Sequence, residues 1–72
     1  STPGSTRINL LLKDSEHLVD VTQILQEING EVLAVGTYAD PTSHRRAYFL
    51  RIAGADGATA TAALRQKGYS LL

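Results

Sequence analysis

The chain has 72 residues, and its seven Lys and Arg residues balance seven Asp and Glu residues. This length allows one small domain. Cysteine is absent, which excludes disulfides, thiolate metal sites and a cysteine nucleophile. The neutral charge argues against nucleic acid as a partner, and no apolar run approaches the ~20 residues of a membrane span. We expect a domain that contacts neither nucleic acid nor membrane and, with no signal peptide visible, a cytoplasmic location.

The first half of the chain predicts a strand followed by a helix. Residues 1–6 are small and polar with a Pro-Gly step, which indicates a linker or a cloning remnant, and 7–72 are expected to form the single domain. Residues 7–13 alternate as a half-buried strand does. A helix is expected next, with Asp14-Ser15 as its N-cap and Asn29-Gly30 as its C-terminal stop. Its apolar stripe has spacings of three and four residues and comprises Leu18, Val21, Leu25 and Ile28.

The second half predicts two strands, a helix and a last strand. Residues 31–39 form an expected strand, and Gly36 within it indicates a bulge or a close approach to the backbone. A turn over 40–44 joins it to an expected strand at 45–52. The remaining expected elements are a helix over 58–67, with Asp56 as a possible cap, and a short strand over 69–72.

The element order is therefore β-α-β-β-α-β, the ferredoxin-like arrangement of the α+β class. The right-handed crossover rule gives a four-stranded antiparallel sheet of order 2-3-1-4 with both helices on one face. The strand residues expected to face the helices are Ile8, Leu10, Leu12, Leu50 and Ile52. The opposite face is expected to carry Arg7, Asn9, Leu11, Lys13, Ala47, Phe49 and Arg51, with Leu11 and Phe49 as exposed apolar residues.

The residue inventory does not favour an enzyme. His17 and His44 lie in different predicted loops without a third ligand nearby, so we expect no metal site and no cofactor. Capping and the helix dipole explain Ser15 and Asp20 without a catalytic triad. Arg45-Arg46 is interpreted as charge that guards the start of a strand. A small enzyme of the acylphosphatase type is the least favoured class, because Arg7 and Asn9 share one strand without a phosphate cradle.

The segment INLLLKDSEHLVDVTQILQEINGEVLAV resembles the ACT domain, a regulatory ferredoxin-like module. Asp14 matches the leading Asp of the family's turn, Leu18 matches its helix Leu, and Gly30-Glu31-Val32 match the return into the second strand. The second half, RRAYFLRIAGADGATATAALRQKGYSLL, is similar to the C-terminal ACT domains of CBS-domain proteins of the acetoin-utilisation type.

The resemblance implies a non-catalytic regulatory domain. ACT domains pair side by side through edge strands, which implies a homodimer through residues 31–39 and a linked domain, such as a CBS pair, in a longer chain. It also implies a small amino-acid-like effector at the seam between copies. The residues implied to bind it are Asp14, Ser15, Glu16, His17 and Leu18, together with Gly36 and Tyr38 of the facing strand.

The alternative is a purely structural dimerisation module without an effector. The turn Asp14–Leu18 lacks the glycine of the family pattern, and a ligand approaches a non-glycine backbone less easily. Both interpretations share the homodimer.

Overall fold

The computed structural model describes residues 4–43 and 45–72, and it confirms the predicted fold class. Residues 1–3 of the predicted linker and His44 of the predicted turn lie outside the described residues. All strand pairs are antiparallel, and the sheet order is β2-β3-β1-β4. The elements are β1 (Thr6–Leu12), α1 (Leu18–Glu27), β2 (Glu31–Ala39), β3 (Arg46–Ala53), α2 (Gly57–Gln66) and β4 (Ser70–Leu71).

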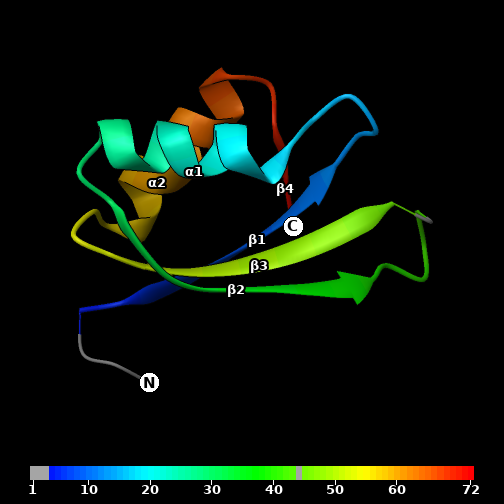
Figure 1. Ribbon diagram of the computed structural model, residues 1–72, viewed down its shortest axis with the longest axis horizontal. Helices are drawn as coiled ribbons and strands as arrows, with labels where there is room; N and C mark the ends of the chain where they lie inside the picture. The colour runs from blue at the N-terminus through cyan, green and yellow to red at the C-terminus, as the bar shows by residue number, and fades with distance from the viewer. Residues whose placement is uncertain (1–3, 44) are drawn as a thin grey trace.

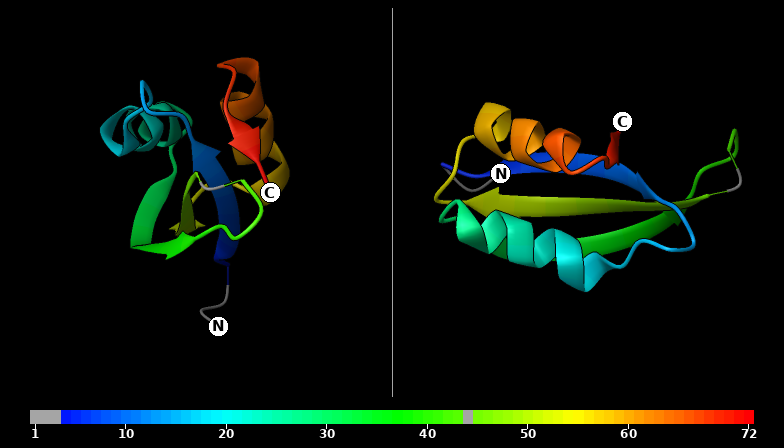
Figure 2. Two further views of the ribbon diagram at one scale, coloured as in Figure 1. Left: turned by 90° about the vertical axis from the view of Figure 1, so that its right-hand side faces the viewer. Right: turned by 90° about the horizontal axis from the view of Figure 1, so that it is seen from above.

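Two layers make up the domain. Both helices cover the same face of the sheet, and the other face, which we call the open face, carries no helix (Figure 1). Seen from the helix side, α1 and α2 lie next to each other, with α1 on the β2 side and α2 on the β4 side, and the β2–β3 hairpin extends beyond them (Figure 2). The sheet therefore presents one covered face, one open face and a long edge formed by β2.

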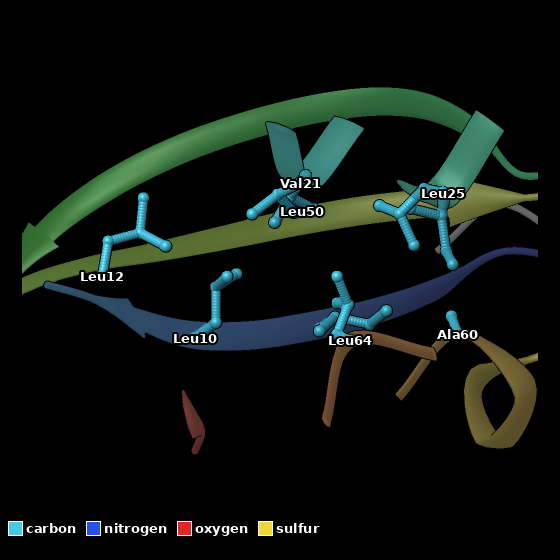
Figure 3. Packing of buried hydrophobic residues seen from close by; sticks show 9 residues of the cluster. Leu10, Leu12, Val21, Leu25, Leu50, Ala60 and Leu64 are labelled. Carbon is cyan, nitrogen blue, oxygen red and sulfur yellow. The ribbon is translucent and has the colours of Figure 1, made fainter. Parts of the chain in front are cut away.

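The core lies between the helices and the covered face of the sheet. The five strand residues predicted to face the helices all belong to it, and Leu10, Leu50 and Ile52 are fully buried. Figure 3 shows Leu10, Leu12 and Leu50 beside the helical residues of the same cluster, which are Val21, Leu25, Ala60 and Leu64. Apolar burial of this kind is the dominant favourable term in folding.

Leu11 departs from the prediction that it is an exposed residue of the open face. Its side chain is only 8% exposed, and its cross-strand partner Ala47 is fully buried. The register explains this, because Leu11 pairs with Ala47 on one side and with Ser70 of β4 on the other. A residue with strands on both sides is shielded by its neighbours even without a helix above it.

Two of the predicted helix ends are confirmed, namely the N-cap of α2 and the C-terminal end of α1. Asp56 is the N-cap of α2, and its Oδ1 accepts the backbone N–H of Thr59 at 2.7 Å. This contact lowers the pKa of the Asp56 carboxyl. Asn29 has a left-handed φ of 65°, and Gly30 donates its N–H to the carbonyl of Leu25 at 2.8 Å. This ends α1 at the position that the Asn-Gly pair predicts.

Candidate functional site

The loop between β1 and α1 is a tight turn that Glu16 closes with both its backbone and its side chain. The Glu16 N–H donates to the Lys13 carbonyl at 2.9 Å, and the Lys13 N–H donates to Glu16 Oε1 at 2.7 Å. The helix begins only at Leu18, with His17 as its N-cap. The predicted cap at Asp14-Ser15 is therefore wrong, because these two residues belong to the turn that Glu16 closes.

Arg46, the first residue of β3, ties this turn to the sheet. Its Nη2 donates to the Lys13 carbonyl at 2.8 Å and to the Glu16 carbonyl at 2.9 Å. A charged donor makes stronger hydrogen bonds than a neutral one, so the turn is held over the end of β3. Sequence reasoning gave Arg46 only a guarding role, since the turn that it clamps is some 30 residues earlier in the chain.

The first turn of α1 lacks a side-chain cap. His17 makes no capping hydrogen bond, and the first acidic residue of the helix is Asp20. Helix N-termini present N–H groups without intrahelical partners, and these groups and the helix dipole favour a small anion. The candidate site is therefore the clamped turn together with the start of α1.

Tyr69, just before β4, also belongs to this neighbourhood. Burial raises the pKa of its phenol, and the negative charges of Asp20 and Glu16 raise it further. The phenol is therefore held in its neutral form, as a potential hydrogen-bond donor beside the turn. No motif in the sequence indicated it, because its position depends on how β4 returns beneath the helices.

Gly36 and Tyr38 lie elsewhere. They alternate with the covered-face residues of β2, so they point to the open face, where they pair with Phe49 and Ala47. The turn lies on the helix side, as Figure 1 shows. The structure thus does not bring the two sets of predicted ligand residues together within one chain. A contact between them requires a second copy, and it remains a prediction.

The glycine at position 36 has a packing explanation of its own. A Cβ built on Gly36 would overlap the ring of Phe49, which lies over this backbone position. The bulge of β2 is not here but between Val32 and Ala34. The sequence predicted either a bulge or a close approach to the backbone at Gly36. The close approach is the one that applies, because the Phe49 ring lies against this backbone position.

The described residues contain neither a metal cluster nor a membrane helix. Within 4–43 and 45–72, no three His, Asp or Glu side chains lie together so that they could hold a metal ion. In the same ranges, no helix is long and apolar enough to cross a membrane.

Comparison with known proteins identifies no relative. No protein-family model matches the chain, and no curated protein or solved structure matches it at a significant level.

We expect Gly36→Ala to lower the free energy of unfolding by about 1–3 kcal/mol, because the new methyl group displaces the Phe49 ring. The same substitution made together with Phe49→Ala is expected to be nearly neutral, since the obstacle is gone. Urea unfolding of the four members of this double-mutant cycle measures the coupling. An equal loss in both backgrounds would contradict the packing explanation.

We expect the Tyr69 phenol to titrate above its ordinary value of 10.0. The folded state then holds this proton more tightly than the unfolded state. Its contribution to stability is complete below the unfolded pKa and is lost as the pH rises through the folded pKa. Ring-carbon NMR shifts follow the titration, and Asp20→Asn should lower the pKa more than Glu16→Gln. A pKa that neither substitution moves would disprove the assigned charges.

Proposed function

We propose that this chain is a non-catalytic ACT-like regulatory domain. Two copies pair through β2, and a small amino-acid-like effector binds at their seam. In a longer chain, such a pair would transmit binding to a linked domain, for which a CBS pair is the candidate, because a ligand that prefers one arrangement of the pair shifts the population toward it. The confirmed ferredoxin-like topology supports this proposal, and the cytoplasmic location remains an expectation.

The observation that carries the proposal is the long uncharged edge of the sheet. β2 is the edge strand next to β3, and its residues 32–39 include no charged side chain. Edge strands that stay unpaired usually carry Lys, Pro or other features that block pairing. The opposite edge is different, since β4 has only two residues. An edge of this kind is suited to pairing with the same strand of a second copy.

The flank of α1 above this edge is uncharged as well. Helix periodicity places Thr22 and Gln26 on the flank away from α2, with the 68%-exposed Val19 beside them. The acidic residues of the helix, Asp20 and Glu27, lie on the other flank and line a hollow with Lys67 of the α2 C-terminus. A copy that approaches β2 would therefore also meet an uncharged helix surface, and it would bury Val19 and Val35.

The clamped turn supplies the chemistry for the effector. The uncapped first turn of α1 offers N–H donors to a carboxylate. Glu16 Oε1 already accepts the Lys13 N–H, so its other carboxylate oxygen is the atom that would attract an ammonium group. The neutral Tyr69 phenol adds a hydrogen-bond donor. Side-by-side pairing would bring the backbone of β2 of the partner copy next to β2 of this copy, whereas Tyr38 points to the open face in both copies.

A structural dimerisation module without an effector is the second candidate. The observation in its favour is that hydrogen-bonding groups of the turn already have partners within the chain. Glu16 and Arg46 already occupy the Lys13 N–H and the carbonyls of Lys13 and Glu16, and the turn has no glycine through which a ligand could approach the backbone. The two candidates differ only in whether a small molecule binds.

We expect the chain to dimerise and Val35→Lys to weaken the dimer at least tenfold. The lysine places like charges close together across a two-fold seam, and such juxtaposition disfavours association. Light scattering and sedimentation over a range of concentrations measure the dissociation constant. The control is Leu72→Lys, which adds the same charge at a residue that is 59% exposed on the opposite edge.

The control variant should dimerise as the unmodified chain does. A mass that stays monomeric at high concentration, or an equal effect of both substitutions, would contradict pairing through β2.

We expect one class of amino-acid-like compounds to shift amide NMR signals of residues 14–18 and 36–38 in a saturable way. Because the site needs both copies, Val35→Lys should weaken this binding in parallel with the dimer. A panel of amino acids and carboxylates that leaves the dimer unchanged would select the structural module. Saturable binding to the monomeric variant with unchanged affinity would exclude a site at the seam.

A further inference from the structure

Arginine side chains cluster on the open face of the sheet. Strand alternation and register place Arg7 and Asn9 of β1 and Phe49 and Arg51 of β3 on this face. Among the described strand residues, the one acidic residue that the register puts here is Glu31, the first residue of β2, opposite Ala53 at the end of β3. No helix covers this face (Figure 1).

Arg7 and Arg51 are direct cross-strand partners. Like charges opposite each other destabilise an antiparallel pair, and no carboxylate forms an ion pair with either residue among the residues that the structure describes. Their side chains turn instead to neutral partners: Arg7 Nε donates to Asn9 Oδ1 at 3.2 Å, and Arg51 Nη1 donates to Ser5 Oγ at 3.3 Å. Such an unfavourable local arrangement is expected at a functional surface.

Arg7 also takes part in a planar stack with Phe49 and Gly36. The Phe49 ring lies on the backbone of Gly36, and the guanidinium of Arg7 lies over the ring at 4.2 Å from its centroid. Arg7 is exposed. The top of the stack is therefore a planar cation, and both aromatic rings and guanidinium planes are surfaces on which nucleobases stack.

The other end of the face adds a third cation. Arg45 lines a hollow of about 350 Å³ near the end of the β2–β3 hairpin, to which Tyr38 and Ala47 contribute from the open face and Thr37, Ala39, Arg46 and Tyr48 from the covered face. Its Nη2 is buried and has no hydrogen-bond partner among the described residues. A buried donor without an acceptor is unfavourable, and an anion that reached the hollow would satisfy it. Asp40, in the preceding turn, accepts the Ser43 N–H at 2.9 Å.

The net charge of zero does not show how the charged residues are distributed over the two sides of the domain. Glu31 and Asp40 are two of the seven acidic residues, and the other five lie on α1, on the loop before it or at the start of α2, away from the open face. These five are Asp14, Glu16, Asp20, Glu27 and Asp56. On the side of the open face, Arg7, Arg45 and Arg51 outnumber Glu31 and Asp40, whereas the other four basic residues belong to the turn before α1, to its Arg46 clamp, or to α2 and its C-terminal end. The part of the open face around Arg7 and Arg51 is therefore complementary to an anion.

We propose that the open face binds a single strand of nucleic acid, with bases stacked on Arg7 over Phe49 and phosphates held by Arg51 and Arg45. About six residues separate Arg45 from Arg51 along the strand direction, roughly 20 Å, so the site accommodates several nucleotides. Asn9, next to Arg7, offers an amide to a base edge. The net charge argued against nucleic acid for the whole chain, whereas the charge of this one face favours it.

Two other occupants fit less well. A second copy would bring the arginines of one open face against those of the other, which opposes association. An acidic peptide could use the charges, but it could not add a strand here, because β1 and β3 are already paired with each other. It would also make no use of the planar stack. The inference does not rest on the proposed pairing, because the open face and the outer edge of β2 are different surfaces.

The test is fluorescence anisotropy of a labelled oligouridine of about ten nucleotides, titrated with the chain at about 50 to 200 mM salt. Affinity should fall with salt, with a slope of about −0.7 per phosphate contacted. Arg51→Gln should weaken binding about tenfold and make the slope shallower by about 0.7. Arg7→Lys keeps the positive charge but removes the planar guanidinium on which a base would stack. Affinity should therefore fall while the slope of affinity against salt stays the same.

Lys67→Gln is the matched control. It removes one positive charge on the helix side, next to Asp20 and Glu27, and it should leave affinity and slope unchanged. An abasic strand of the same length should bind at least about fivefold more weakly, because it lacks the bases that stack. Undetectable binding at low salt, equal effects of Lys67→Gln and Arg51→Gln, or equal binding of the abasic strand or of a polyglutamate peptide would overturn the proposal.

Discussion

The pairing of β1 with β3 decides which surface of this domain each side chain occupies. Ile8 stands opposite Leu50, and Arg7 stands opposite Arg51. Since strand side chains alternate, a shift of one residue would move the leucines to solvent and the arginines into the core. The burial of Leu10 and Leu50 therefore stabilises this register, and the register in turn creates the arginine-rich open face. The same pairing places Arg46 next to the end of β1, where it can reach the turn that follows.

Much of this architecture is predictable, because it depends on periodicity. The alternation in residues 7–13 and the helical spacing from Leu18 to Ile28 are local patterns, and the crossover rule converts them into one topology. The start of α1 was mispredicted because Asp14 and Ser15 are good caps in general, while the Glu16 side chain closes a turn around them. Leu11 was mispredicted because its burial comes from neighbouring strands and not from a helix.

The candidate sites are less predictable, because each joins segments that are distant in the sequence. The Arg46 clamp, the approach of Tyr69 to Asp20 and Glu16, and the stack of Gly36, Phe49 and Arg7 all require the folded chain. Composition gave a net charge of zero, and only the placement of strands and helices shows that five of the seven acidic residues lie away from the open face, where Arg7 and Arg51 lie. The two proposals accordingly use separate surfaces. In the first, the edge of β2 would pair with a second copy, and the open face of each copy would remain free for the second in the continuous sheet that results.

Hydrogen exchange of the β2 amides, followed at increasing chain concentration, measures whether this edge pairs with a second copy. In a monomer, the amides of β2 that point away from β3 are open to solvent, whereas a partner strand would protect them. We expect alternate amides between Val32 and Ala39 to become protected as the concentration rises, while those of β4 do not change. Exchange that is independent of concentration throughout β2 would contradict it.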